Sequence, residues 1–295
     1  TVRKLNIGII GLGGIGGLLA ILLSNKNFKV FTSKKIKKDQ ILYLKSKFYG
    51  NLKTKIEFDK SLKKSDIIFV CSKFPYLKKH LKFISNNKAL VIPFLNGLSH
   101  FEILQKKFRK KLLTSTIGKV VSKKINRNII IHDSKNKPEV LINFDKVSKN
   151  NQKILLNIFK IIQVRAKVIK DRNNVIWSKL IRLSAISAIT SLYNCNLGKI
   201  RKSKIKIKEL DSLLIESIKL SKKVFKNNFS INKIKKIINT FPNELTTSLQ
   251  RDINLNIHSE LETQVGSIVK LSNKYKISLP MYKKIYIKLK KNEKN

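Results

Sequence analysis

The first half of the chain alternates short apolar runs with segments of helical spacing. Strand-like runs occupy residues 4–10, 28–32, 66–71 and 89–94, and helical spacing lies between them at 15–25 and 77–84. Strands that alternate with helices are typical of a parallel, doubly wound sheet. Further strand-like runs follow at 112–117, 128–132, 140–144 and 166–169, with a helix expected over about 150–162.

After about residue 171 the pattern changes to helical spacing only. Helices are predicted over residues 173–192, 205–227, 231–239, 248–275 and 280–289, and no strand is predicted there. A polar cluster at 170–173 separates the two regimes. We therefore predict an α/β domain of residues 1–170 followed by an all-α domain of residues 171–295.

A glycine-rich turn follows the first predicted strand. The run Gly11-Leu12-Gly13-Gly14-Ile15-Gly16 matches G-x-G-x-x-G between a strand and a helix, the context in which this motif binds dinucleotides. Gly11 permits a tight turn, Gly13 lets the backbone approach a pyrophosphate, and Gly16 lets helix and strand pack closely. Glycine turns also serve purely structural roles, but this placement favours a dinucleotide held at the helix start.

The end of the second predicted strand indicates which dinucleotide binds. NAD sites usually carry an acid there for the ribose 2′-hydroxyl, whereas this chain has Ser33, Lys34 and Lys35 and no acid before Asp39. Cations and a hydroxyl suit a 2′-phosphate, which favours NADPH. The alternative is that this segment reflects composition alone, because lysines are abundant and acids scarce throughout the chain.

Polar residues follow two predicted parallel strands. Lys73 lies two residues after the strand that ends at Cys71, and Asn96-Gly97 lies two residues after Phe94. Ligands of open α/β sheets bind at these carboxyl ends. A solvated loop lysine and a simple turn are the structural alternatives.

The helical half holds candidate catalytic side chains. Lys179, Leu183 and Ser187 are spaced i, i+4, i+8 on one stripe of an otherwise apolar helix. A lysine there either meets an anionic partner or snorkels from the first turn. Further along the chain, Ser248 is interpreted either as a helix N-cap or as a site residue. Glu260 is interpreted either as an ion-pair partner or as an active-site carboxylate.

Composition limits which partners, compartments and metal sites are expected for this chain. The 295 residues carry a formal charge of +47, but the lysines are spread along the chain, so a nucleic-acid partner is not expected. The 2 cysteines exclude a disulfide scaffold and favour a reducing, cytoplasmic compartment. No long uncharged apolar run predicts a membrane span. His258 has no second ligand at metal spacing, so no metal is expected.

Together these residues resemble the ketopantoate reductase (2-dehydropantoate 2-reductase) family. The resemblance rests on the glycine turn, Lys73, Asn96-Gly97, Trp177-x-Lys179, Asn194-Cys195, and Ser248-x-x-x-Asp252 with Glu260, and covers about residues 5–286. It implies a Rossmann-type NADPH-binding domain joined to a helical domain, and reduction of 2-dehydropantoate to (R)-pantoate on the route to coenzyme A. A small-molecule 2-keto acid would be the partner, and the protein a monomer or homodimer.

The resemblance also implies roles for single residues. Lys179 is similar to the family's catalytic lysine, which polarises the ketone and supplies the proton, and Glu260 to the carboxylate that holds the substrate hydroxyl. Asn96, Ser187 and Ser248 match substrate-contacting positions. The glycine turn, Ser33, Lys34, Lys73 and Asn96 would hold the cofactor.

The helix of Lys179 departs from the family pattern. Family members commonly carry asparagines at the positions of Leu183 and Ser187. The stripe beside Lys179 is therefore less polar than usual. A relative that reduces another 2-keto acid, or one that has lost activity, is the alternative prediction.

Overall fold

The computed structural model describes residues 5–33, 41–86 and 88–293. The chain divides into two compact units. Unit 1 comprises Thr1–Leu95 and His100–Val175, and unit 2 comprises Asn96–Ser99 and Ile176–Asn295. The segment Asn96–Ser99 thus clusters with the helical unit, although the sequence places it inside the first predicted domain.

A parallel five-stranded sheet forms the centre of unit 1. Its strands run in the order β5 (Glu57–Phe58), β2 (Lys29–Thr32), β1 (Asn6–Ile10), β6 (Ile67–Val70) and β7 (Leu90–Pro93), and every neighbouring pair is parallel. The predicted parallel sheet is confirmed. Strands β1, β6 and β7 are almost entirely buried, which explains why they read as continuous apolar runs.

Two smaller mixed sheets complete unit 1. The first has the order β4 (Gly50–Lys55), β3 (Ile41–Ser46), β10 (Ile129–His132) and β9 (Ser122–Ile125), and the second β12 (Arg165–Val168), β11 (Glu139–Asn143) and β8 (Thr114–Gly118). The pattern did not predict β3, β4, β5 or β9. In β4 and β9 polar and charged residues dominate and no residue is fully buried, so the apolar signal is weak.

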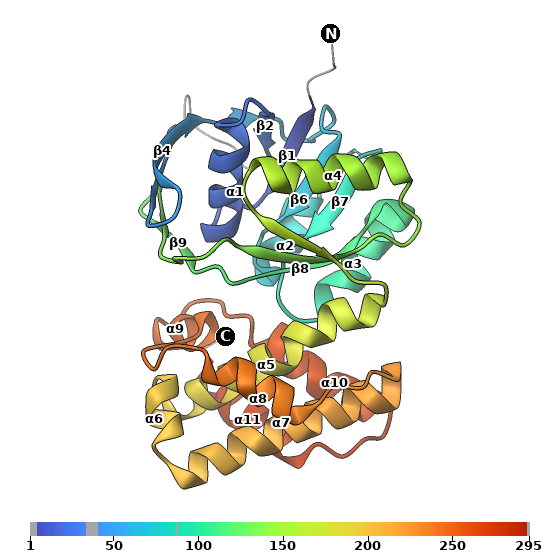
Figure 1. Ribbon diagram of the computed structural model, residues 1–295. Helices are drawn as coiled ribbons and strands as arrows, with labels where there is room; N and C mark the ends of the chain where they lie inside the picture. The colour runs from blue at the N-terminus through green and yellow to red at the C-terminus, as the bar shows by residue number, and fades with distance from the viewer. Residues whose placement is uncertain (1–4, 34–40, 87, 294–295) are drawn as a thin grey trace. The chain divides into compact units, whose positions relative to one another are not determined.

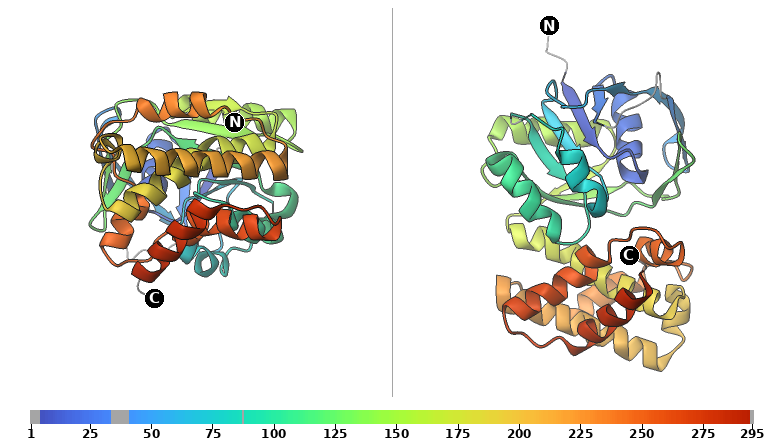
Figure 2. Two further views of the ribbon diagram at one scale, coloured as in Figure 1. Left: turned by 90° about the horizontal axis from the view of Figure 1, so that it is seen from below. Right: turned by 180° about the vertical axis from the view of Figure 1, so that it is seen from behind.

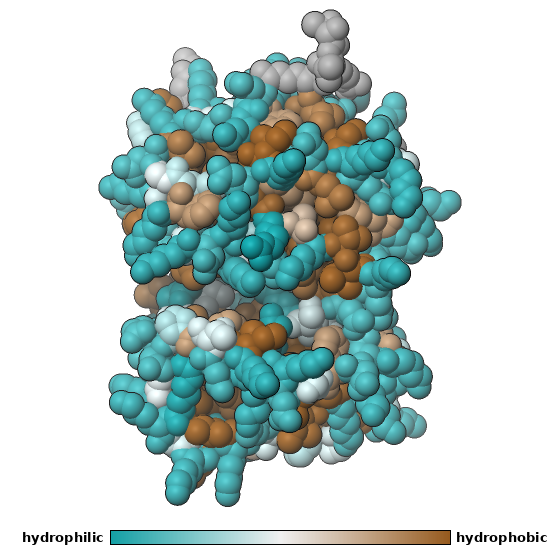
Figure 3. All heavy atoms as spheres, in the orientation of Figure 1, coloured by the Kyte–Doolittle hydropathy of each residue, from teal (hydrophilic) through white to brown (hydrophobic). Residues whose placement is uncertain are grey.

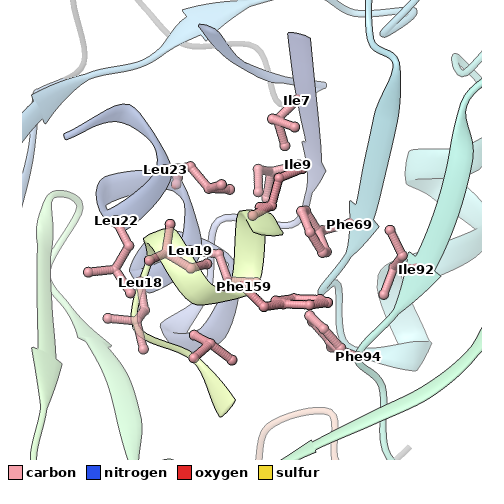
Figure 4. Close-up of a cluster of buried hydrophobic side chains, with 14 of the residues drawn as sticks. Ile7, Ile9, Leu18, Leu19, Leu22, Leu23, Phe69, Ile92, Phe94 and Phe159 are labelled. Atoms are coloured by element: carbon pink, nitrogen blue, oxygen red, sulfur yellow. The ribbon is translucent and has the colours of Figure 1, made fainter. Parts of the chain in front are cut away.

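Four helices cover the two faces of the parallel sheet. On one face α1 (Gly14–Ser24) and α4 (Lys149–Ile161) enclose a core with side chains of β1, β6 and β7, and Figure 4 shows Leu19, Leu23 and Phe159 on the side toward Ile9 and Phe69. On the other face α2 (Phe74–Leu81) and α3 (Ser99–Phe108) pack over Ile68 and Val91, and a 3₁₀ turn, Arg109–Lys111, follows α3. Helices on both faces are the doubly wound arrangement.

Unit 2 consists of helices throughout its described residues (Figures 1 and 2). They are α5 (Arg172–Tyr193), which begins in unit 1, α6 (Leu197–Arg201), α7 (Lys204–Phe225), α8 (Ile231–Asn239), α9 (Ser248–Asn254), a π-helical turn η2 (Glu262–Gly266), α10 (Ser267–Lys274) and α11 (Pro280–Asn292). By length and composition α5 could cross a membrane, but most of it is buried, as in the core helix of a soluble domain.

The single helix predicted over 248–275 is wrong. The chain leaves α9 after Asn254, Asn256 adopts a left-handed φ of 50°, and the Ile257 amide donates back to the Asp252 carbonyl at 3.1 Å. The Ser259 hydroxyl then accepts from the Leu261 amide, which starts the next helical segment. Asparagine tolerates the left-handed region and serine caps helices, so local chemistry overrides the helical spacing.

Hydrophilic side chains are spread over both units on the face that Figure 3 shows, rather than gathered in one stripe. The lysines contribute to this even distribution because they occur along the whole chain. A nucleic-acid binder concentrates its basic residues in a patch. This distribution therefore favours a compositional origin of the +47 charge.

Glu216 stabilises the start of α11 from inside unit 2. Its two carboxylate oxygens accept hydrogen bonds from the Met281 and Tyr282 amides at 2.9 and 3.0 Å, where α11 lacks a side-chain cap of its own. Glu216→Ala would leave these amides without acceptors beside the core. We expect a loss of about 2–3 kcal/mol in the free energy of unfolding, measured by urea denaturation. Glu244→Ala, which truncates an exposed glutamate, is the control, and equal midpoints for the two variants would contradict the capping role.

Candidate functional site

The glycine turn between β1 and α1 has the geometry of an anion cradle. Gly11 has a φ of +93°, and a Cβ on it would lie 2.5 Å from the Ser72 Cα. A Cβ on Gly16 would lie 1.9 Å from the Gly11 carbonyl oxygen, so only glycine allows this close packing. By contrast, nothing lies within 4 Å of a Cβ built on Gly13. The open side of the turn is therefore at Gly13, the N-cap of α1.

Strand β9 supports this turn and brings a cation to it. The Ser122 hydroxyl donates to the Gly14 carbonyl at 2.9 Å, and the Lys124 ammonium donates to the Leu12 carbonyl at 3.1 Å. The first turn of α1 contains no acid and has no side-chain cap, so its amides suit a phosphate. Lys124 was not predicted from the sequence, because no local signal distinguishes it from the other lysines. These features fit a dinucleotide at the turn.

The remaining predicted cofactor residues of unit 1 lie at strand ends. Ser33 directly follows β2, is buried, and its hydroxyl has no hydrogen-bond partner among the described residues. Lys34 and Lys35 lie outside the described residues. Lys73 is the N-cap of α2, three residues beyond the end of β6. The buried hydroxyl of Ser33 suits a ligand that supplies an acceptor or donor.

Three predicted site residues meet in unit 2. The Lys179 ammonium on α5 donates to the Asn96 Oδ1 at 2.8 Å, and the Asn96 Nδ2 donates to the Glu260 Oε2 at 3.1 Å. Lys179 and Asn96 are partly buried and Glu260 is buried. We name this chain of hydrogen bonds the Lys179–Asn96–Glu260 network. It joins an ammonium, an amide and a carboxylate from segments far apart in sequence.

Burial and charge tune the lysine of this network. Desolvation lowers the pKa of Lys179 to about 8, the Glu260 carboxylate opposes this fall, and Arg182 on the same helix adds to it. A pKa near the working pH is what an efficient general acid requires. The network therefore combines an ammonium of lowered pKa with a carboxylate whose charge favours the protonated form of that ammonium.

The Asn96 side chain is placed by the glycine that follows it. Gly97 has a φ of +84°, and a Cβ on it would lie 1.9 Å from the Thr263 carbonyl oxygen of η2. The Leu98 amide donates to the same oxygen at 3.4 Å. Asn96-Gly97 thus packs directly on the π-helical turn that follows Glu260, which holds both side chains in register.

Other predicted substrate contacts lie on α5 and α9. Ser187 is fully buried, and its hydroxyl has no hydrogen-bond partner in the described part of the chain. Leu183, one turn nearer to Lys179, is partly exposed and lies outside the described hydrophobic core of unit 2. Ser248 begins α9 but is not its cap, because Thr247 accepts the capping bond from the Gln250 amide at 3.2 Å. The interpretation of Ser248 as the N-cap of this helix is therefore wrong.

The described residues contain no group of three or more histidine, cysteine or acidic side chains that could hold a metal ion. His258 lies in the segment between α9 and η2.

Family profiles match both halves of the chain. Residues 7–140 match the family described as ketopantoate reductase PanE/ApbA, and residues 171–293 match the ketopantoate reductase PanE/ApbA C-terminal family. No individual curated protein matches the sequence.

Solved structures share the fold at low sequence identity. A dimeric ketopantoate reductase from Staphylococcus aureus is 18% identical, with 98% of this chain and 99% of that chain covered and a TM-score of 0.79. A 2-dehydropantoate 2-reductase from Geobacter metallireducens is 14% identical, with 97% and 99% covered and a TM-score of 0.86. A D-mandelate dehydrogenase in complex with NADH and anilino(oxo)acetate is 17% identical, with 98% of each chain covered and a TM-score of 0.85.

Proposed function

Because the chain belongs to the ketopantoate reductase family, whose members are NAD(P)-dependent oxidoreductases, we propose that it reduces 2-dehydropantoate to (R)-pantoate with NADPH. The observation that carries the proposal is the Lys179–Asn96–Glu260 network. The proposed enzyme is a cytoplasmic monomer or homodimer that acts on a small 2-keto acid. It has no nucleic-acid or membrane partner.

Each residue of the network has a separate role in the proposed ketone reduction. The cofactor, when bound, supplies the hydride. The Lys179 ammonium donates a hydrogen bond to the ketone oxygen and then gives it a proton, which converts the carbonyl into a hydroxyl. Glu260 keeps the lysine protonated before the reaction and accepts a hydrogen bond from a substrate hydroxyl. Asn96 holds the two at a set separation, since it bonds to both.

Unit 1 provides the groups that would hold the cofactor. The glycine turn, with the α1 amides and the Lys124 ammonium, would bind the pyrophosphate. Ser33, Lys34 and Lys73 would contact the ribose phosphate and the neighbouring part of the cofactor. These assignments rest on the open turn at Gly13 and the buried Ser33 hydroxyl.

We expect NADPH to bind at least tenfold more tightly than NADH, because Ser33 and Lys34 suit a 2′-phosphate and no acid follows β2 along the chain before Asp39. Lys34→Glu should weaken NADPH far more than NADH, since it places a negative charge beside the phosphate. Fluorescence titration of both cofactors measures this. Lys26→Glu, which changes the charge of an exposed lysine after α1, is the control. Equal or tighter binding of NADH by the wild-type protein would reject the preference.

A second candidate is a related 2-keto acid reductase with a different substrate. It is favoured by Leu183 and Ser187, which make the stripe beside Lys179 less polar, and by the partial exposure of Leu183 outside the core. The fold is also similar to that of a D-mandelate dehydrogenase. A partly exposed leucine near the proposed acid would favour a substrate with an apolar side group.

One experiment separates the two candidates. NADPH oxidation by the purified protein is followed with ketopantoate and with a panel of 2-keto acids that carry apolar or aromatic side groups. The highest kcat/KM with ketopantoate supports the first candidate, and a much higher value with another keto acid supports the second. In that case Leu183→Asn with Ser187→Asn should shift the preference toward ketopantoate. No turnover of any keto acid would reject both.

A further inference from the structure

Gln264 is a buried amide that contacts the Lys179–Asn96–Glu260 network. Its Nε2 donates to the Glu260 Oε2 at 3.1 Å, the same oxygen that accepts from Asn96. The side chain is fully buried, so no water competes for this bond. Its backbone amide also donates to the Glu260 carbonyl oxygen at 3.0 Å. Gln264 is thus bound to Glu260 through both its side chain and its main chain.

Gln264 lies four positions after Glu260, within the π-helical turn η2. This turn, residues 262–266, begins two residues after Glu260, and Thr263 in it packs against Gly97. Single π-helical turns inside helical segments are frequent at functional sites. The turn therefore carries the Gln264 amide and the contact surface for Asn96-Gly97 together.

The hydrogen bond to Glu260 requires one orientation of the Gln264 side-chain amide. The Gln264 Oε1 has no hydrogen-bond partner in the described part of the chain. If the amide were flipped, this oxygen would face the carboxylate and the two acceptors would repel each other. Only the orientation with Nε2 toward Glu260 is attractive. A buried acceptor left unsatisfied is tolerated here because the donor bond to a carboxylate is strong.

We propose that Gln264 is a positioning residue that holds the Glu260 carboxylate against Asn96, an inference that rests on the function proposed above for this network. With two amide donors on one oxygen, Glu260 is held both charged and in place. Its charge in turn supports the protonated form of Lys179. Gln264 therefore acts on the proton donor through Glu260.

Charged groups near the network include Arg182 on α5 and Glu262 on η2. Lys179 is influenced by Glu260 and by Arg182 on its own helix. Glu262, two residues from Glu260, is engaged elsewhere, by Tyr286 of α11 at 2.6 Å, by Lys270 of α10 at 2.7 Å and by Lys290 of α11 at 3.0 Å. Gln264 is uncharged, so its removal changes the hydrogen bonding of Glu260 without changing the net charge of the unit.

The direct test is the titration of Glu260 in the full-length protein. The chain has nine glutamates, so selective ¹³C labelling of glutamate side chains gives few carboxyl signals, and Glu260→Gln identifies the one from Glu260. We expect Gln264→Met to raise the pKa of Glu260 by about one unit, because one of two donors to the charged form is lost. Gln264→Glu, which keeps the shape, should raise it further because two carboxyl groups then compete for charge. An unchanged Glu260 titration in both variants would overturn the proposal.

A matched control separates positioning from packing. Asn227→Leu removes another buried amide of unit 2, which bonds to Ser221 at 2.9 Å, and should leave the Glu260 titration unchanged. An equal shift in this variant would show that loosening of the unit, rather than the lost bond, moves the pKa. Such a result would also overturn the proposal.

Activity gives the second readout. With the preferred keto acid, Gln264→Met should lower kcat about tenfold while the Kd for NADPH stays within about twofold, since a misplaced general-acid partner costs rate. An unchanged kcat would overturn the positioning role. If the wild-type protein reduces no keto acid, the proposed function fails, and the Glu260 titration still decides whether Gln264 holds the carboxylate.

Discussion

Lys179→Ala is expected to lower kcat by at least about a hundredfold, the usual effect of losing a positioned general acid. The physical reason is that Lys179 is the proposed proton donor of the network, bonded to Asn96 at 2.8 Å and influenced by Glu260. NADPH affinity should change little, because the glycine turn proposed to bind the cofactor lies in unit 1. Single-turnover hydride transfer with the cofactor confirmed as bound is the measurement.

The pH dependence of kcat/KM should reflect the titration of Lys179. Burial lowers the pKa of Lys179 to about 8. The acid must be protonated to act, so kcat/KM should be highest below this pH and fall about tenfold per unit above it. Lys179→Ala should lack this fall in kcat/KM at alkaline pH.

Lys199→Ala, which truncates an exposed lysine of α6, is the matched control and should keep the wild-type rate and profile. Near-normal hydride transfer in Lys179→Ala would remove Lys179 from the mechanism. Lys73, at the end of β6, would then be the next candidate for the acid.

Gly97→Ala is expected to lower kcat by about a hundredfold without touching a reacting group. The added Cβ would lie 1.9 Å from the Thr263 carbonyl oxygen, so the Asn96-Gly97 turn or η2 must move. A displacement of about 1 Å at a catalytic group can cost this much rate. Steady-state kinetics with the preferred keto acid measures it. The φ of +84° adds about 1–3 kcal/mol of backbone strain, which thermal unfolding detects.

Gly50→Ala separates strain from displacement. Gly50 has a similar φ of +74°, but nothing lies within 4 Å of a Cβ built there. This variant should lose stability through strain and keep its activity. Wild-type kcat in Gly97→Ala, or an equal loss of kcat in Gly50→Ala, would contradict the placement of Asn96 by packing on η2.

Local pattern was sufficient for much of this fold. The buried strands of the parallel sheet are continuous apolar runs, because both of their faces are covered, and most helices of unit 2 follow from their spacing. The glycine turn follows from residue type and order alone. The identity of Lys179, Asn96 and Glu260 as candidates came from single residues in unusual surroundings and from family resemblance.

Where local signals were weak or conflicting, prediction from the sequence was incomplete or wrong. Strands β4 and β9 are rich in polar and charged residues, and they pair with β3 and β10, whose buried side chains share a core with those of α1. The break after Asn254 depends on a left-handed Asn256, which helical spacing does not reveal.

The sequence by itself determined the order of the buried strands and of most helices, the glycine turn and the chemical groups available, because backbone sterics and hydrophobic periodicity act over a few residues. Only the tertiary structure decided which groups meet. Lys179 and Asn96 are 83 positions apart, and Asn96 and Glu260 are 164 apart. Gln264, four positions after Glu260, bonds to the same Glu260 oxygen as Asn96. Such contacts depend on how helices pack and on the close approach that Gly97 permits, which no short stretch of sequence encodes.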